Sequence, residues 1–395
     1  MTPRQGSATP RKNSPRERRI SFVEFLNGKK IDSALITDPR DIYYLSGYSA
    51  FWPRQAAFLI LTHGDSQLLV GQAWDKKGAA NAKNVFEDHI STFVDYELHT
   101  RMITYEGTVA RELERFLRRS KPFMKSKRIG LEDWHISRTY FETVQKAAPR
   151  SKFANISDSI LNWRKTKGTD ELTNLKTAAK RLDLAYQTAK ENIKPGKSEL
   201  ALCSEVSGYS IMRDGPFEFA RGDTWLSGER TLEIGGPPSD RTFKIGDGVL
   251  MDLQALYNNY WADGARTYIV GKPTEAQERI FNVVLAAKEK GEEMLRPGTT
   301  SRDVYYAVAN EIKKAGYSEF FPHHAGHGLG LEVQEGPFFI PACKDKLEEN
   351  QVCTLEPGIY HPAVGGFRDE DTYIITKKGY EKFTTSTSKL EGIIA

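Results

Sequence analysis

Apolar residues recur at regular intervals from Ile20 onward, and their spacing predicts a first group of elements. Phe22, Phe25 and Leu26 fall on one face of a short helix. Short apolar runs bounded by turn residues predict strands, and a longer stretch predicts a second helix. The strands are expected at 33–37, 57–62, 67–70 and 128–131, and the second helix at 107–118. Strands mixed with helices in this way are typical of an α/β domain.

The pattern changes after a charged stretch at 164–171, which we take as a domain boundary. Apolar residues then recur at three- and four-residue spacing from Leu172 to Ile193, and Pro195-Gly196 follows. This predicts a long amphipathic helix. Further helices are expected near 198–212 and 274–295 and from Ser301, and strands at 248–253, 260–270, 351–356 and 367–376.

Together these elements predict a mixed α/β (α+β) fold with two domains, because 395 residues exceed the size at which one core usually stops growing. We expect a smaller first domain over residues 20–165 and a second domain over residues 168–395. Residues 1–19 are expected to form a disordered basic tail outside both domains.

The tail accounts for the positive charge of the chain. Residues 1–19 carry six basic residues against one acidic residue, with three prolines and no apolar periodicity. This composition is typical of a solvated, disordered arm, and the alternative is a basic arm that touches nucleic acid or a membrane. Without the tail, the 56 basic and 52 acidic residues of the chain become 50 and 51. We therefore expect no nucleic-acid partner.

Apolar runs and cysteines argue against two further classes of protein. The longest apolar run extends only from Ala56 to Leu61, far short of the roughly 20 residues that a membrane helix needs. Cys203, Cys343 and Cys353 are too few, and odd in number, for a disulfide scaffold, so they favour a reducing compartment. We therefore expect a cytoplasmic protein with no membrane partner.

Candidate chemistry lies in the second half, where four carboxylates and one imidazole fall on predicted strands, at strand ends or in a glycine-rich run. The set consists of Asp252, Asp263, His327, Glu356 and Glu370. Two strands joined by a turn at Asn258-Asn259 can bring the first two acids face to face. Taken singly, each acid is more often a surface charge, and the histidine a loop residue. The ordered set with its flanking sequence favours a site.

Carboxylate oxygens and imidazole nitrogens are ligands that Mn²⁺, Co²⁺, Fe²⁺ and Zn²⁺ accept. Bridging carboxylates can hold two such ions roughly 3.5–4 Å apart, and a water between them becomes a nucleophile near neutral pH. We therefore expect two divalent metal ions. A three-histidine site of His323, His324 and His327 is the alternative. Adjacent residues on a strand point to opposite sides, so we expect only His327 to bind metal.

With these motifs in place, the chain resembles the pita-bread metallopeptidases over nearly all of its length outside the tail. Residues 38–47 (DPRDIYYLSG) resemble the entry to a creatinase-type N-terminal domain. Asp252 and Asp263 with ten residues between them, and then GHGLGLE at 326–332, LEPG at 355–358 and RDED at 368–371, match the five-ligand signature in order. This family includes Xaa-Pro dipeptidases (prolidases), aminopeptidase P, methionine aminopeptidases and creatinase. The arginine two residues before Glu370 favours the prolidase and aminopeptidase P branch.

The resemblance implies a creatinase-like N-terminal domain followed by a pita-bread catalytic domain, and it implies a role for each ligand. Asp252 and Asp263 would chelate one metal ion. His327 and Glu356 would bind the other, and Asp263 and Glu370 would bridge the two.

The same resemblance implies a second role for Glu356 and supporting roles for two further residues. Glu356 would also lie near the nucleophilic water, where it could move a proton. Arg368 would orient the carboxylates. His323, four residues before His327, matches a family histidine near the substrate and is our second catalytic candidate.

Two positions depart from the family pattern. Peptidases of this family usually carry one histidine in the loop before the first aspartate and another seven residues after the ligand histidine, and both support peptide hydrolysis. This chain has Gly235 and Gln334 there. A glutamine can donate a hydrogen bond but cannot titrate, so Gln334 becomes a substrate-binding candidate. The metal site is expected to be intact, whereas ordinary Xaa-Pro cleavage lacks two supporting groups.

The first domain offers one more pair of candidates, Trp52 and Arg54. Creatinase has an aromatic-x-Arg pair in a similar region that reaches into the partner subunit's site. By that resemblance Trp52 and Arg54 would bind a substrate carboxylate through an aromatic wall and a guanidinium fork. The alternative is a strand-edge Trp and a surface Arg. If the functional interpretation holds, the active unit is a homodimer.

We therefore expect a dinuclear metal hydrolase that resembles Xaa-Pro dipeptidase and aminopeptidase P and acts on a small carboxylated, peptide-like substrate. The first alternative keeps the fold and changes the chemistry, to a creatinase-, ectoine hydrolase- or dimethylsulfoniopropionate lyase-like reaction. The second is a non-catalytic binding module, which would typically have lost metal ligands.

Overall fold

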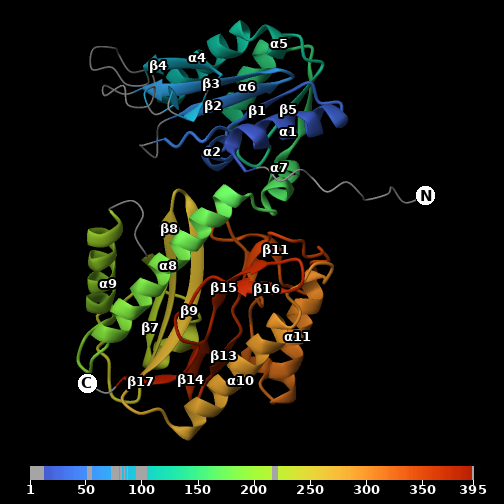
Figure 1. Ribbon diagram of the computed structural model, residues 1–395. Helices are drawn as coiled ribbons and strands as arrows, with labels where there is room; N and C mark the ends of the chain where they lie inside the picture. The colour runs from blue at the N-terminus through green and yellow to red at the C-terminus, as the bar shows by residue number, and fades with distance from the viewer. Residues whose placement is uncertain are drawn as a thin grey trace. The chain divides into compact units, whose positions relative to one another are not determined.

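The computed structural model describes residues 13–50, 56–72, 80, 82–83, 85–86, 88–94, 105–215 and 221–393. The chain divides into two compact units, Met1–Asn162 and Trp163–Ala395. Each unit has its own sheets and helices (Figure 1). The second unit carries all five candidate ligands.

The first unit is built on a six-stranded mixed sheet with the order β4-β3-β2-β1-β5-β6. Its strands are β1 (Ser33–Ile36), β2 (Ala57–Thr62), β3 (Asp65–Gln72), β4 (His89–Val94), β5 (Arg128–Leu131) and β6 (Lys152–Asn155). Its helices are α1 (Pro15–Gly28), α2 (Pro39–Ser46), α4 (Tyr105–Arg119), α5 (Lys121–Met124), α6 (Arg138–Ala147) and α7 (Ser157–Arg164), the last of which runs into the second unit. The four strands predicted from the apolar runs are confirmed, with β1 one residue shorter than expected.

The prediction of a disordered tail through residue 19 is wrong at its end. Helix α1 begins at Pro15, after Ser14 caps it by accepting a hydrogen bond from the Glu17 N–H. Arg18 and Arg19 are buried, and they donate to the backbone carbonyls of Tyr44 and Leu45 at the end of α2. Carbonyl groups at a helix C-terminus lack hydrogen-bond donors within the helix, and the two guanidinium groups donate to them instead. Residues 15–19 therefore belong to a helix of the first unit and not to the disordered tail that their charge suggested.

A buried acidic group joins the start of α2 to the end of β5. Glu132 is fully buried, and its Oε2 accepts hydrogen bonds from the N–H groups of Thr37 and Asp38. Asp38 caps α2 and is held by Arg40 and by His135 Nε2 at 2.9 Å. Burial, and then the charge of nearby Asp41, raise the pKa of Glu132 well above its ordinary value of 4.5.

This raised pKa predicts a pH-dependent stability. A carboxyl group whose pKa is raised on folding adds to the free energy of unfolding in full when the pH is below its unfolded-state pKa. This added stability is lost as the pH rises through its folded-state pKa. The unfolding free energy of the wild type should therefore decrease as the pH rises above 4.5. The Glu132→Gln variant should lack this decrease, because it has no carboxyl group at this position. Urea unfolding of both full-length proteins from about pH 4 to about pH 9 measures the difference. Glu142→Gln, at an exposed position, is the control, and identical pH profiles for wild type and Glu132→Gln would contradict the prediction.

The second unit contains two main sheets and one hairpin. The first sheet has the order β17-β9-β8-β7, the second has the order β11-β10-β12-β15-β16, and β13 pairs with β14. The strands are β7 (Arg221–Ser227), β8 (Gly248–Tyr257), β9 (Tyr260–Val270), β10 (His327–Gly328), β11 (Glu335–Phe338), β12 (Val352–Leu355), β13 (Gly358–His361), β14 (Gly365–Arg368), β15 (Asp371–Ile375), β16 (Tyr380–Lys382) and β17 (Glu391–Ile393). Short 3₁₀ turns lie at η1 (Gly228–Glu233) and η2 (Ser318–Phe320).

Two pairs of helices pack on these sheets. Helices α8 (Thr169–Asn192) and α9 (Glu199–Asp214) contact β7, β8 and β9, whereas α10 (Glu275–Glu292) contacts β12, β13 and β14 and packs against α11 (Ser301–Lys314). In Figure 1 the two helix pairs lie on opposite sides of this unit, with the strands between them. The helices predicted near 172–193, 198–212 and 274–295 and from Ser301 are confirmed.

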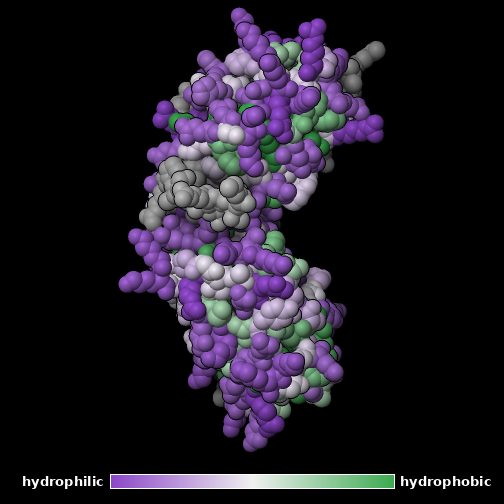
Figure 2. Space-filling model, turned by 90° about the vertical axis from the view of Figure 1, so that its right-hand side faces the viewer, coloured by the Kyte–Doolittle hydropathy of each residue, from purple (hydrophilic) through white to green (hydrophobic). Residues whose placement is uncertain are grey.

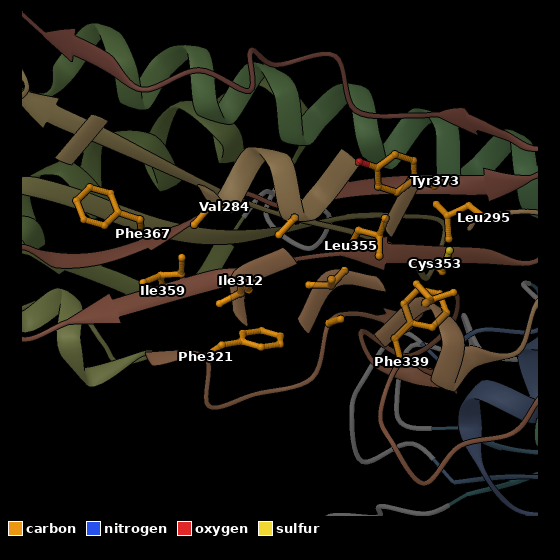
Figure 3. Close-up of a cluster of buried hydrophobic side chains, with 14 of the residues drawn as sticks. Val284, Leu295, Ile312, Phe321, Phe339, Cys353, Leu355, Ile359, Phe367 and Tyr373 are labelled. Atoms are coloured by element: carbon orange, nitrogen blue, oxygen red, sulfur yellow. The ribbon is translucent and has the colours of Figure 1, made fainter. Parts of the chain in front are cut away.

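The apolar core of the second unit lies beneath α10 and α11. Figure 3 shows side chains from these helices meeting side chains from the second sheet and the β13–β14 hairpin. Val284, Ile312, Leu355 and Tyr373 are all fully buried there. Burial of this kind stabilises by roughly 25 cal/mol per Å² of apolar surface. The strands that end in candidate ligands are therefore anchored on a packed layer.

One prediction about the second unit needs correction. The strand expected over 367–376 is two strands, β14 and β15, interrupted at Asp369 and Glu370. The second unit begins at Trp163, beside the charged stretch at 164–171 that is predicted as the boundary. Within that stretch Arg164 and Lys167 are buried and pair with Glu335 at 2.6 and 2.5 Å.

Hydrophilic residues cover most of the second unit on the face seen in Figure 2, and apolar residues are scattered among them. Within the residues that the structure describes, no helix combines the length and the apolar character needed to cross a bilayer.

Candidate metal centre

The first two candidate ligands lie on the β8–β9 hairpin. Asn258 and Asn259, both with positive φ, form its turn, as a tight hairpin that follows the strand twist requires. Asp263 pairs directly with Gln254, two residues after Asp252, so all three side chains share one face. Gln254 Nε2 donates to Asp252 Oδ1 at 3.0 Å and to Asp263 Oδ1 at 3.1 Å. The predicted juxtaposition of the two aspartates is present.

The other three candidates come from the second sheet and the hairpin beside it. His327 lies in β10, Glu356 follows β12, and Glu370 lies in the break between β14 and β15. His327 Nε2 is 3.4 Å from Glu356 Oε1 and 3.6 Å from Asp263 Oδ2. Ligand atoms of Asp263, His327 and Glu370 all lie within 4.8 Å of one another. Residues from two sheets thus meet at one point.

The tautomer of His327 follows from its hydrogen bond. Its Nδ1 lies 3.0 Å from the carbonyl oxygen of Gly328, which can only accept, so Nδ1 carries the proton. Nε2 therefore presents a lone pair to the carboxylates of Asp263 and Glu356. Burial lowers the pKa of His327, which keeps the ring neutral. A lone pair that faces carboxylate oxygens is unfavourable unless a proton or a metal cation lies between them.

The buried carboxylates also favour a bound cation at this site. Both oxygens of Glu370 are buried, and within the described residues neither accepts a hydrogen bond. Burial, and then the neighbouring carboxylates, raise the pKa values of Asp263 and Glu370 well above the ordinary range, and burial raises that of Asp252 to about 7. Buried like charges at this spacing are unfavourable unless a cation compensates them. The donor set of carboxylate oxygens and one imidazole fits a hard or borderline divalent ion.

Glu356 behaves differently from the other acids. Burial alone would raise its pKa, but the contact with His324, whose own pKa this carboxylate raises, holds the pKa of Glu356 at about 2. Its Oε1 accepts a hydrogen bond from Thr354 Oγ1 at 3.3 Å, and His324 Nδ1 lies at the same distance. Glu356 is therefore the ionised member of the group.

A chain of hydrogen bonds supports Asp252. Arg368 contacts Asp252 Oδ2 at 2.8 Å and donates to Tyr360 Oη at 3.0 Å. Tyr360 Oη lies 2.9 Å from His323 Nε2, and His323 Nδ1 lies 2.7 Å from the carbonyl oxygen of His324. Nδ1 must donate to that carbonyl, so Tyr360 donates to Nε2. Both nitrogens of His323 are thus engaged with protein groups, and its proposed role near the substrate stays a prediction.

The remaining candidates lie apart from this cluster or outside the described residues. Gln334 is exposed in the loop between β10 and β11. Gly235 lies beside Thr224, which pairs with Asp252, and a Cβ there would meet Thr224 Oγ1 at an ordinary 3.4 Å. Trp52 and Arg54 fall in 51–55, outside the described residues.

A buried charge cluster lies directly behind Glu370. Lys288 pairs with Asp369 and, at 2.7 Å, with Asp371, and it donates to Ser388 Oγ. Arg266 pairs with Asp371 at 2.6 Å and donates to the carbonyl oxygen of Glu370. All four charged groups are buried. Because the carboxylate of Glu370 has no hydrogen-bond donor within the described residues, its flanking residues and its backbone fix its position.

Sequence reasoning missed three parts of this arrangement. Gln254 could have been found, because it lies two residues from Asp252 on the same strand face. Lys288 could also have been found, because it lies four residues after Val284 and seven after Phe281, on the buried face of α10. Its partners Asp369 and Asp371 could not have been assigned from the sequence. His324 was set aside on the premise of a strand, but strand β10 begins only at His327.

The chain matches known protein families over both of its halves. A profile of the metallopeptidase family M24 matches residues 173–377. The chain belongs to this family. A profile of the creatinase/prolidase N-terminal domain matches residues 18–165. The predicted family, the mixed α/β fold class and the assignment as a metallohydrolase are confirmed.

Similar M24 proteins are known in sequence and in structure. The Xaa-Pro dipeptidase of Pyrococcus horikoshii is 31% identical over 369 residues, covering 93% of this chain and 97% of the relative. The Xaa-Pro dipeptidase of Pyrococcus furiosus is 30% identical over 377 residues, covering 95% and 99%. The crystal structure of the P. horikoshii prolidase matches with a TM-score of 0.81 at 30% identity, over 96% of this chain and 100% of that one. The X-Pro aminopeptidase from Thermotoga maritima matches with a TM-score of 0.79 at 25% identity, over 95% and 99%.

The charge cluster behind Glu370 gives a prediction for this M24 protein. Lys288→Met leaves Asp369 and Asp371 short of one buried cation, so the free energy of unfolding should fall by about 3–5 kcal/mol. Lys288→Met/Asp369→Val removes one charge of each sign and should recover most of the loss. Urea unfolding of the full-length, metal-free protein measures both variants.

Lys290→Met is the matched control, because Lys290 lies two residues further along α10 and pairs with the exposed Glu293. It should change stability by less than about 0.5 kcal/mol. A Lys288→Met protein as stable as the wild type would show that the cluster does not support this part of the site.

Proposed function

We propose that this M24 protein is a dinuclear metal-dependent Xaa-Pro dipeptidase that hydrolyses the peptide bond before proline in short peptides. The observation that carries the proposal is the buried set around His327, in which a neutral imidazole and carboxylates face one another. Two relatives of nearly the same length are named Xaa-Pro dipeptidase, which supports the substrate class.

Five residues would hold two divalent ions in this proposal. These residues would be Asp252, Asp263, His327, Glu356 and Glu370, of which Asp263, His327 and Glu370 have ligand atoms within 4.8 Å of one another. Bound divalent ions supply charge that polarises a carbonyl and lowers the pKa of a bound water. Mn²⁺, Co²⁺, Fe²⁺ and Zn²⁺ all accept such a donor set.

The protein groups around the ligands do the positioning. Gln254 holds Asp252 and Asp263 in register by donating to both, and Arg368 fixes the second oxygen of Asp252. The burial of all five ligands keeps bulk water away, so the electrostatic effect of each group is strengthened. Glu356, the ionised acid of the group, is the side chain suited to accept a proton during hydrolysis.

The absence of histidine at Gly235 and Gln334 does not favour another reaction class by itself. Gln334 is exposed, and no contact between it and the candidate ligands is present within the described residues. The proposal therefore places peptide hydrolysis on the five ligands and on Glu356. A homodimer in which Trp52 and Arg54 reach the partner's site stays a prediction from the resemblance.

The direct test is hydrolysis of Ala-Pro by the Mn²⁺-loaded protein, with Ala-Gly as the control substrate. The wild type should bind about two equivalents of Mn²⁺, measured by elemental analysis, and cleave Ala-Pro but not Ala-Gly. Asp263→Ala should lose both metal and activity while remaining folded. Glu293→Ala, an exposed acid on the same unit, should keep both.

The outcomes separate the two parts of the proposal. Two equivalents of Mn²⁺ without cleavage of Ala-Pro would contradict the substrate assignment and leave the metal site standing. Full activity in Asp263→Ala would contradict the dinuclear site.

Removal of metal should reveal the repulsion within the cluster. In excess chelator, raising the pH should lower the melting temperature of the wild type more than that of Glu370→Gln, because burial raises the pKa of Glu370 and makes its ionisation in the folded protein costly. Addition of Mn²⁺ should raise the melting temperature of the wild type far more than that of the variant, since only the wild type keeps the full ligand set. Differential scanning calorimetry of both proteins measures this, and equal shifts on adding Mn²⁺ would rule Glu370 out as a ligand.

A further inference from the structure

His324 is the most exposed side chain in direct contact with a carboxylate of the metal centre. Its side chain is 28% exposed, whereas that of His327 is 1% exposed and that of Arg368 is 6% exposed. Among the described side chains in contact with the acids, His324 is therefore the one most open to solvent.

The main chain fixes His324 in this place. Ala325, the next residue, donates its N–H to the carbonyl oxygen of Phe339 and accepts a hydrogen bond from the N–H of Glu356, both at 3.0 Å. The backbone of this segment is thus tied to the strand end that carries Glu356. The proximity of the His324 ring to the Glu356 carboxylate follows from this backbone pairing.

The ring of His324 differs from its two neighbours in its partners. His323 and His327 each donate Nδ1 to a backbone carbonyl. His324 Nδ1 is buried and forms no hydrogen bond of good geometry within the described residues, but it lies 3.3 Å from Glu356 Oε1. A small adjustment of the ring would complete that bond. The compact ligand set of Asp263, His327 and Glu370 does not include His324.

We propose that His324 positions the Glu356 carboxylate through Nδ1–H and contacts the substrate through Nε2. With the proton on Nδ1, Nε2 carries a lone pair and accepts a hydrogen bond. The free α-amino group of a short peptide is a donor of the class that this atom recognises. This inference rests on the proposed peptidase function and adds a residue to it.

Two substitutions separate the two contacts. Asn places its amide nitrogen near the position of Nδ1 and has nothing at Nε2, whereas Gln reaches the Nε2 position without replacing Nδ1. His324→Asn should therefore keep kcat and raise KM for Ala-Pro by about fivefold to tenfold. His324→Gln should lower kcat by about tenfold or more at nearly unchanged KM. His324→Ala should show both changes.

Metal content provides a readout that does not depend on turnover. All three variants should keep the same number of Mn²⁺ equivalents as the wild type. Loss of an equivalent would overturn the proposal, because His324 would then be a metal ligand. His361→Ala is the control, since His361 packs on Phe320 and Tyr317 at the end of β13, and it should match the wild type.

A third readout separates this inference from the proposed function. Long-range ¹H–¹⁵N spectra of the full-length, metal-free protein give the tautomer of His324, assigned by comparison with His324→Ala. A protonated Nδ1 supports the proposal even if the wild type cleaves no Xaa-Pro peptide. A protonated Nε2, or wild-type kcat and KM in His324→Ala, would overturn it.

Discussion

The second unit depends on one electrostatic constraint, the burial of four carboxylates around a single neutral imidazole. The protein chain brings these groups together without placing enough positive charge among them. Arg368 is the one cation in direct contact with a ligand carboxylate, on Asp252, among the ion pairs of the described residues. Without metal, protons can neutralise these acids, as their raised pKa values indicate. A bound divalent ion would replace those protons and would stabilise the folded chain.

The constraint explains features that would otherwise look irregular. A tight asparagine turn aligns Asp263 with Gln254 and so places both aspartates on one strand face. The interruption between β14 and β15 lets Glu370 leave the ladder while its neighbours remain buried. The Lys288 and Arg266 side chains pair with those neighbours, whereas the carboxylate of Glu370 accepts no hydrogen bond within the described residues.

The sequence predicted the long helices and hairpin strands well because those elements rest on local periodicity. Helix α8 and strand β9 are examples, since their apolar spacing spans whole elements. The five candidate ligands were predicted as a set. Asp263, Glu356 and Glu370 lie near His327, and Asp252 shares the Gln254 donor with Asp263. The errors lie where distant residues decide the structure. Arg18 and Arg19 looked solvated until α2 supplied carbonyls, and Asp369 gave no sign that a lysine 81 residues away neutralises it.

The pairing of Arg164 and Lys167 with Glu335 has a consequence for where the catalytic unit begins. The family profile starts at residue 173, yet these two cations precede it and neutralise an acid next to the loop that follows His327. A fragment cut at the profile boundary would bury Glu335 without either partner, beside the hairpin that presents the imidazole. A unit that keeps both partners of Glu335 therefore starts before Arg164, within α7, so these residues belong to the packed second unit rather than to a linker.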